Sequence, residues 1–234
     1  AIKILARFLY SVQEKTDLRL AQWNSGKMHN AIPRDGKIIF AVPSDKKEEI
    51  KADWNIFTAN VEDEFHVTDV AMAWSLESTD AQKVLPKQVS ENLIKAVQAV
   101  DNGVCAMCQD EELAWMVETS SNIASVQSDE KEVVCVTSQR SNVMSNLKNI
   151  ANSVKAVFEL AGAKVVTNEG YPAWKMRKGS KLQKITIDAY RKLFGKDPIV
   201  KGIHAGLECG LFSEKYPDLD MVSFGPTLRF VHTP

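Results

Sequence analysis

The segment from His204 to Gly210, His-Ala-Gly-Leu-Glu-Cys-Gly, is the part of the chain whose residue types and spacing most suggest chemistry. It follows an apolar run typical of a strand and reads as a glycine turn, Ala205-Gly206, that leads into a short helix containing Glu208. A turn of this kind exposes backbone N–H groups that can bind a carboxylate or an oxyanion. Such a turn is nevertheless more often structural than functional when it stands alone.

Three further residues could serve the same kind of site. His232 follows a strand-like stretch and precedes Thr-Pro, and α/β proteins place ligands beyond the carboxyl ends of strands. Arg140 ends a β-rich run, from which its guanidinium could hold a carboxylate in a bidentate pair. Asn30 stands just before Ala-Ile-Pro. Without further context, a structural histidine, a solvated arginine and a turn asparagine are at least equally good interpretations.

The four cysteines give a weaker signal. Cys105 and Cys108 have the C-x-x-C spacing of zinc and redox sites, but there is no second pair, no nearby histidine and no βαβ context. Cys135 and Cys209 are predicted to be buried in a strand and a helix. An even number of cysteines in a chain of 234 residues, without a secretory signal, favours reduced thiols and a cytoplasmic location.

Hydrophobic periodicity predicts the elements that would position these residues. Helices are expected at residues 2–14, 44–61, 89–100, 141–160, 182–194 and 207–212. Strands are expected at residues 18–23, 37–42, 65–76, 115–126, 133–139, 164–167, 199–204 and 220–224, with a turn at 24–27 and a further short strand up to residue 32.

Up to residue 170 the predicted order of helix, strand, strand, helix and strand occurs twice. We therefore expect an α+β fold of two tandem ferredoxin-like (open-faced sandwich) units, joined into one antiparallel sheet with helices on one face. Residues 171–234 instead follow an α/β order and would form an incomplete segment of another domain. A helical pattern begins at the first residues without a cap and the chain stops after a strand, so we interpret both ends as interior points of a longer polypeptide.

Composition excludes several classes of protein. With 44% hydrophobic and 25% charged residues, the chain is not of a disordered, collagen-like or disulfide-stapled kind. A net charge of −1 without a basic cluster argues against nucleic acid and anionic membranes as partners. No apolar run approaches the roughly 20 residues that a membrane helix needs.

The motifs carry a family resemblance. The stretches at 171–174, 204–212, 216–226 and 232–234 resemble the C-terminal part of the bacterial aminoacyl-histidine dipeptidases, of the two-zinc peptidase family that includes carnosinase. The stretches at 18–20, 30–34, 117–120 and 160–164 resemble the lid domain of the same proteins. The resemblance implies a lid domain over residues 1–170 and a C-terminal strip of the catalytic domain over residues 171–234.

The resemblance also assigns roles. It implies that His232 binds one of two zinc ions, that Asn30 and Arg140 reach from the lid to a dipeptide of the Xaa-His type, and that the turn at Ala205, Gly206 and Glu208 binds the substrate. Manganese or cobalt could replace zinc. The other metal ligands and the general base of the family are absent, so we expect the chain alone to be inactive and to lack a complete metal site. A homodimer is compatible with the family.

A reading from a different class of protein stays open. Ferredoxin-like repeats also form small-molecule-binding or oligomerising regulatory modules, in which an edge strand such as residues 18–23 pairs between chains.

Overall fold

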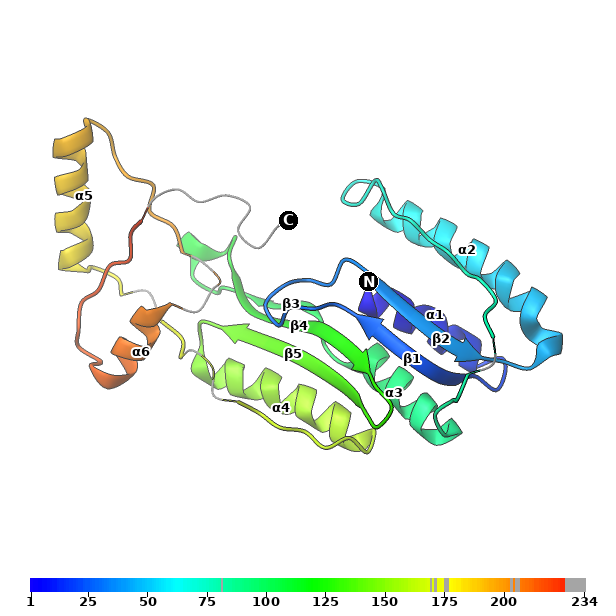
Figure 1. Ribbon diagram of the computed structural model, residues 1–234. Helices are drawn as coiled ribbons and strands as arrows, with labels where there is room; N and C mark the ends of the chain where they lie inside the picture. Colours follow the sequence, from blue (N-terminus) through cyan, green and yellow to red (C-terminus); the bar gives the residue numbers. More distant parts are fainter. Residues whose placement is uncertain are drawn as a thin grey trace. The chain divides into compact units, whose positions relative to one another are not determined.

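The computed structural model describes residues 1–80, 82–168, 170, 172–174, 177–202, 204 and 207–225 (Figure 1). The helices are α1 (Ile2–Gln13), α2 (Lys47–Phe65), α3 (Lys87–Ala99), α4 (Met144–Leu160), α5 (Lys181–Phe194) and α6 (Glu208–Lys215). The strands are β1 (Arg19–Ser25), β2 (Gly36–Ala41), β3 (Gly103–Met107), β4 (Val117–Ser128) and β5 (Val133–Ser141). Short 3-10 turns precede α2 at Ser44–Lys46 and β4 at Glu111–Leu113. No helix within the described ranges is both long and apolar enough to cross a membrane.

The five strands form one antiparallel sheet in the order β2-β1-β4-β3, with β5 also paired to β4. β1 pairs with β2 along its length and meets β4 only at its end, through Asn24↔Gln127 and Ser25↔Val126. The other part of β4 pairs with β3. β4 is therefore the strand that pairs with three others, β1, β3 and β5.

A bulge in β1 decides which of its side chains are buried. The pairing with β2 shifts by one residue between Leu20 and Gln22. Leu20 and Trp23 are three positions apart, so in a regular strand their side chains would lie on opposite faces. The extra residue of the bulge brings both side chains to the same face, and both are buried in the core. The Trp23 side chain is fully buried, and its indole donates a hydrogen bond to Ser25 Oγ at 3.2 Å.

Contacts between Cα atoms divide the chain into two compact units, which we describe separately. Unit 1 comprises residues 1–102, 122–138 and 153–165, and unit 2 comprises residues 103–121, 139–152 and 166–234. The predicted lid (residues 1–170) and catalytic strip (residues 171–234) are defined by function and not by these units, and they stay a prediction.

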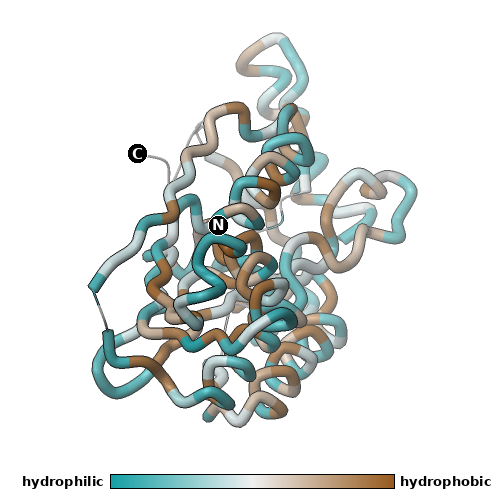
Figure 2. The backbone as a smooth tube through the Cα atoms, turned by 90° about the vertical axis from the view of Figure 1, so that its right-hand side faces the viewer, coloured by the Kyte–Doolittle hydropathy of each residue, from teal (hydrophilic) through white to brown (hydrophobic). Residues whose placement is uncertain are grey.

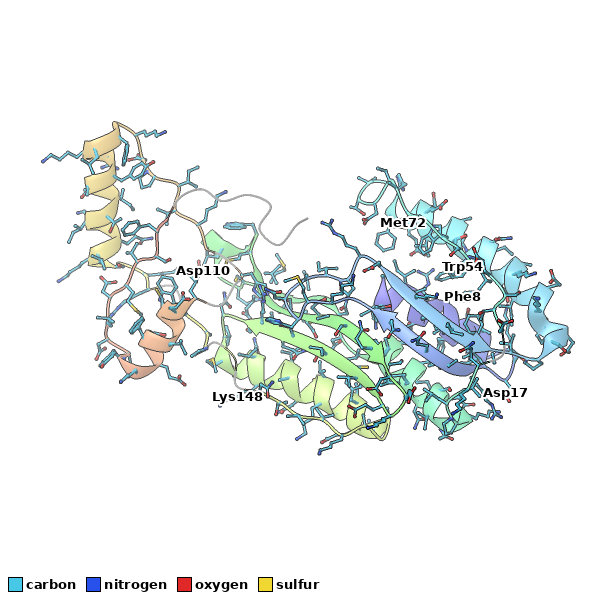
Figure 3. The ribbon with its side chains drawn as sticks, in the orientation of Figure 1. Phe8, Asp17, Trp54, Met72, Asp110 and Lys148 are labelled. Carbon is cyan, nitrogen blue, oxygen red and sulfur yellow. The ribbon has the colours of Figure 1, made fainter. Side chains whose placement is uncertain are left out.

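The core of unit 1 lies between its helices and β1. α1 has its apolar residues at helical spacing, and Ile2, Leu9 and Val12 are buried. The same alternation of apolar and polar residues is visible along the helical turns of the tube in Figure 2. An aromatic cluster joins α1 to α2, with the rings of Phe8 and Trp54 4.8 Å apart, edge to face (Figure 3).

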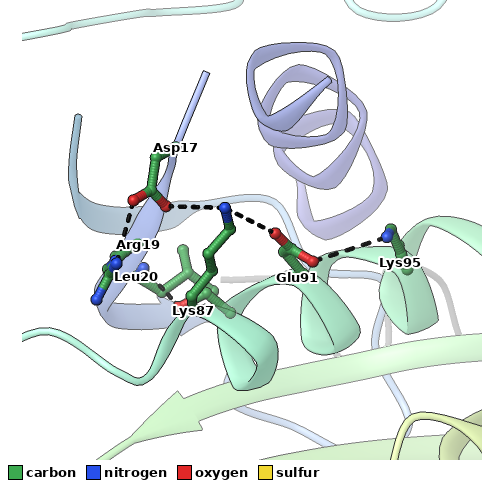
Figure 4. A network of polar contacts seen from close by, with 7 residues as sticks. Asp17, Arg19, Leu20, Lys87, Glu91 and Lys95 are labelled. Carbon is green, nitrogen blue, oxygen red and sulfur yellow. Dashed lines mark hydrogen bonds and ion pairs between the residues drawn. The ribbon is translucent and has the colours of Figure 1, made fainter. Parts of the chain in front are cut away.

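Polar contacts attach α3 to the rest of unit 1. The Lys3 ammonium donates to the carbonyls of Val97 and Val100 at 3.0 and 2.9 Å, near the C-terminal end of α3 where carbonyls lack helical partners. A chain of ion pairs runs along α3 and on to the start of β1 (Figure 4): Lys95, Glu91, Lys87, Asp17 and Arg19. Being exposed, these pairs contribute little individually.

The α+β class, the single antiparallel sheet and the six helices agree with the sequence-based predictions. The described residues do not show the two expected tandem ferredoxin-like units. The strands predicted to complete them, residues 65–76 and 164–167, do not form. α2 continues to Phe65, whose carbonyl accepts from the backbone of Thr68 and Asp69, so residues 66–76 begin with a turn. Residues 164–167 are likewise not a strand.

Other predicted strands are also wrong. No strand runs up to residue 32, because β1 extends through Ser25 and residues 26–35 form a loop. β1 lies between β2 and β4 in the strand order, but only Asn24 and Ser25 pair with β4, so residues 19–23 pair with β2 alone among the described strands. The described residues of 199–204 and 220–224 form no strand, whereas β3 is a strand that the sequence reading missed.

Candidate functional site

In unit 2 the pairing of β4 with β5 places Ser120 opposite Arg140. Three hydrogen bonds fix this register: Asn142 N–H to Glu118 O at 3.1 Å, Thr119 Oγ1 with Ser141 Oγ at 2.9 Å, and Gln139 Nε2 to Ser121 Oγ at 3.2 Å. Because side chains alternate along a strand, Ser120 and Arg140 share the face opposite to that of Thr119 and Ser141.

His204 joins both of these strand residues. Its Nε2 atom is 2.7 Å from Ser120 Oγ, and its backbone carbonyl accepts a hydrogen bond from Arg140 Nη1 at 3.3 Å. Burial lowers the pKa of the His204 imidazole below its ordinary value, and the positive charge of Arg140 lowers it further, while a hydrogen bond with the Val117 backbone acts in the opposite direction. The imidazole is therefore neutral at pH 7.

The residues next to this pair make contacts of a structural kind. The Glu118 side chain is buried and accepts hydrogen bonds from Thr119 Oγ1 and from Asn146 Nδ2 of α4. The Asn142 amide donates to Cys108 Sγ at 3.3 Å. These bonds hold α4 and β5 against β4, and thereby support the register that aligns Arg140 with Ser120.

The remaining predicted site residues lie apart from this group or outside the description. Asn30 belongs to the loop 26–35 of unit 1, and its Oδ1 atom is buried with no hydrogen-bond partner among the described residues. Glu208 is exposed in the first turn of α6. Ala205, Gly206 and His232 lie outside the described residues. Among the predicted residues that the structure describes, Arg140 is thus the one that contacts the segment of the glycine motif.

The described residues do not fit a metal centre. Among them no three His, Cys, Asp or Glu side chains are grouped so that they could hold a metal ion. Glu62, His66 and Asp69 line a hollow in unit 1 without forming such a group. Of the cysteines, Cys105 is exposed, and burial of Cys135 in β5 raises the pKa of its thiol to about 12.

Comparison with known proteins identifies the relationship. No family model matches the chain. The chain is 34% identical over 235 residues to the cytosol non-specific dipeptidase of Escherichia coli (strain K12), and this match covers all of the chain and 48% of that protein. The crystal structure of the aminoacylhistidine dipeptidase from Vibrio alginolyticus aligns with a TM-score of 0.87 and 35% identity, over all of the chain and 47% of that structure. The chain is a partial homologue of these dipeptidases. It spans about half the length of each.

The structure of this dipeptidase homologue adds two residues that the sequence reading did not select. His204 opens the glycine motif, and Ser120 ends the stretch 117–120 that carried the resemblance to a lid. Both residues lie in motifs that carry the resemblance, but nothing in the local sequence around either one predicts that they touch. Their 84-residue separation is bridged only by the fold.

Proposed function

We propose that the chain supplies part of the dipeptide-binding site of a zinc-dependent, cytoplasmic dipeptidase, with residues 1–170 as lid and residues 171–234 as part of the catalytic domain. The relationship to dipeptidases over the whole chain supports the proposal. The single observation that carries it is the position of Arg140, whose guanidinium bonds to the residue immediately before the Ala205-Gly206 motif.

Arg140 is suited to bind the free carboxylate of a dipeptide. The bond to the His204 carbonyl uses one of the five N–H donors of a guanidinium, and at 3.3 Å it is long. A carboxylate offers two charged acceptors in a geometry that matches the guanidinium, so it forms stronger bonds than a neutral carbonyl. A longer peptide could not place its carboxylate at the same point, so this contact would restrict substrate length.

The family resemblance assigns Asn30 to substrate binding as well, through its side-chain amide. Its amide N–H would donate a hydrogen bond to the dipeptide, while its Oδ1 atom is buried without a partner among the described residues. Glu208, Ala205 and Gly206 are proposed to line the substrate as well, and His232 to ligate zinc. Because the described residues do not fit a two-zinc centre, we derive no catalytic step through the metal.

A binding experiment tests the carboxylate role on the chain itself. Titration of the isotope-labelled chain with alanyl-histidine should shift the Arg140 side-chain resonances in a saturable way, whereas the C-terminally amidated dipeptide should not. Arg140→Ala should abolish binding. Arg177→Ala is the matched control, because Arg177 also donates to a backbone carbonyl in unit 2, that of Asp218 at 2.8 Å. Equal binding of the amidated dipeptide would refute the proposal.

An activity experiment tests the wider proposal. The chain alone, with zinc, should not hydrolyse alanyl-histidine, but a chimera in which it replaces the matching part of the Escherichia coli relative should. In that chimera Arg140→Ala should lower kcat/KM by roughly ten- to a hundredfold, since a charge-assisted pair is worth about 1.5–3 kcal/mol. Arg140→Lys should restore only part of this, because it keeps the charge and loses the fork. Hydrolysis by the chain alone, or a folded but inactive chimera, would overturn the proposal.

A further inference from the structure

We infer that His204 is a positioning residue: its side chain, held by Ser120, fixes the backbone carbonyl that orients the Arg140 guanidinium. This inference deepens the proposed function and rests on it for the identity of the ligand. It adds individual roles for two residues, His204 and Ser120.

The geometry of the group carries the inference. Ser120 and Arg140 are cross-strand neighbours on one face, and each bonds to a different part of the same residue. Ser120 Oγ holds the imidazole at 2.7 Å, and Arg140 Nη1 holds the carbonyl. With the additional hydrogen bond to the Val117 backbone, the ring is tied to two positions of β4. The carbonyl of His204 therefore has a defined place relative to the base of the Arg140 side chain.

A close approach at Gly202 supports the same attachment. A Cβ atom at residue 202 would lie 2.6 Å from Met116 Sδ, just before β4, so only glycine fits there without displacing the methionine. The segment that carries His204 thus packs directly against the beginning of β4 at a second point. Two separate contacts, one steric and one hydrogen-bonded, hold it beside the strand.

The contact with the His204 carbonyl would lower the entropy cost of binding by restricting the Arg140 side chain beforehand. A free arginine side chain has many rotamers, and binding a carboxylate requires most of them to be given up. A neutral carbonyl held beside the guanidinium selects the useful rotamers in advance, and it competes only weakly with a charged carboxylate. Preorganisation of this kind raises affinity without adding a contact to the ligand.

The test uses four variants of the full chain: Ser120→Ala, His204→Phe, His204→Gln and the control Ser121→Ala. Ser121 is the next residue of β4, is buried, and bonds Gln139 on the opposite face, so its loss removes a comparable hydroxyl away from Arg140. The readouts are the rotation and hydrogen exchange of the Arg140 guanidinium by NMR without ligand, and the Kd for alanyl-histidine. Thermal melting of each variant checks that it is folded.

Ser120→Ala and His204→Phe should speed guanidinium exchange and raise the Kd on the order of tenfold, equivalent to about 1.4 kcal/mol. His204→Gln, which keeps a polar group near the Nε2 position, should recover part of both, and Ser121→Ala should change neither. If the unaltered chain binds the dipeptide through Arg140 and the variants bind equally well, the positioning role is wrong while the proposed function stands. If neither the unaltered chain nor any variant binds the dipeptide, the proposed function fails. Separately, if guanidinium exchange is the same in the variants as in the unaltered chain, the positioning role is refuted.

Discussion

At the scale of single residues, the contact between His204 and Arg140 depends on the charge state of the imidazole. Arg140 is permanently cationic, so a neutral His204 is a tolerable neighbour and a protonated one is not. The direction of the pKa shift agrees with this, since both burial and the charge of Arg140 disfavour the protonated form. The neutral state can keep one ring nitrogen as acceptor for the Ser120 hydroxyl.

This arrangement predicts a pH dependence of stability. A histidine whose pKa is lowered by folding binds a proton more readily in the unfolded state, so its contribution is unfavourable at low pH and disappears at high pH. The free energy of unfolding should therefore decrease as the pH falls below about 6.5, the ordinary pKa of histidine. Urea unfolding at pH 7.5 and pH 5.5 measures this, with His204→Gln as the comparison. The other titrating groups are common to both proteins, so the decrease should be smaller in the variant; an equal decrease would contradict the prediction.

At the scale of elements, the end of β1 depends on one glycine. Gly26 has a φ of +69°, and a Cβ atom there would lie 2.1 Å from the carbonyl oxygen of Ala124 in β4. The chain leaves β1 at this point and enters the loop that contains Asn30. Gly26 does not form a tight hairpin turn. Its lack of a side chain instead allows its backbone to approach the backbone of β4 closely.

Gly26→Ala should consequently destabilise unit 1 strongly. The left-handed backbone alone costs an alanine about 1–2 kcal/mol, and displacement of the β4 backbone adds to this. Gly162→Ala is the control, because Gly162 has a φ of +83° but no atom within 4 Å of the added Cβ, so it should show only the backbone cost. Denaturant titration of both variants measures the difference, and equal destabilisation would show that the contact with Ala124 yields without cost.

The sequence predicted helices better than strands, and the reason is physical. The apolar stripe of a helix such as α1 or α4 is a property of one continuous segment, so its period can be found from that segment alone. A strand needs a partner that the local pattern does not contain. Residues 66–76 alternate like a strand, yet Trp74 packs on Trp54 and its indole donates to Glu62 of α2, so its ring is partly buried by contacts with a helix and not by a strand ladder.

The candidate site was predictable to a similar extent. Arg140 could be chosen because the end of a strand and the chemistry of a guanidinium are both local features. Its partners could not, because the pairing of Ser120 with Arg140 depends on the register of β4 and β5, and His204 reaches them from a distant segment. The bulge in β1 is a similar case, since a single inserted residue reverses which side chains face the core.

At the scale of the whole molecule, the two units differ in how their helices are supported. α1 and α3 of unit 1 bury Phe8, Leu9, Ile94 and Val97 in a shared core. α5 of unit 2 has no buried residue, and its apolar side chains Ile185 and Phe194 are 63% and 61% exposed. Polar contacts at its ends support α5 instead: Ser180 and Asp220 accept hydrogen bonds from the N–H groups of Gln183 and Leu182, and Gly195 ends the helix in a left-handed conformation.

Because caps and exposed ion pairs contribute only about 1 kcal/mol each, α5 should open far more often than α1 or α3. Hydrogen exchange of the chain should therefore show α5 amides exchanging by local opening, at rates at least a hundredfold above those of the α1 and α3 core. Ser180→Ala should accelerate exchange in α5 by roughly fivefold, the equivalent of about 1 kcal/mol, and leave α1 unchanged. Equal protection of α5 and α1 in a monomer would mean that α5 is stabilised by contacts that its exposed apolar face does not reveal.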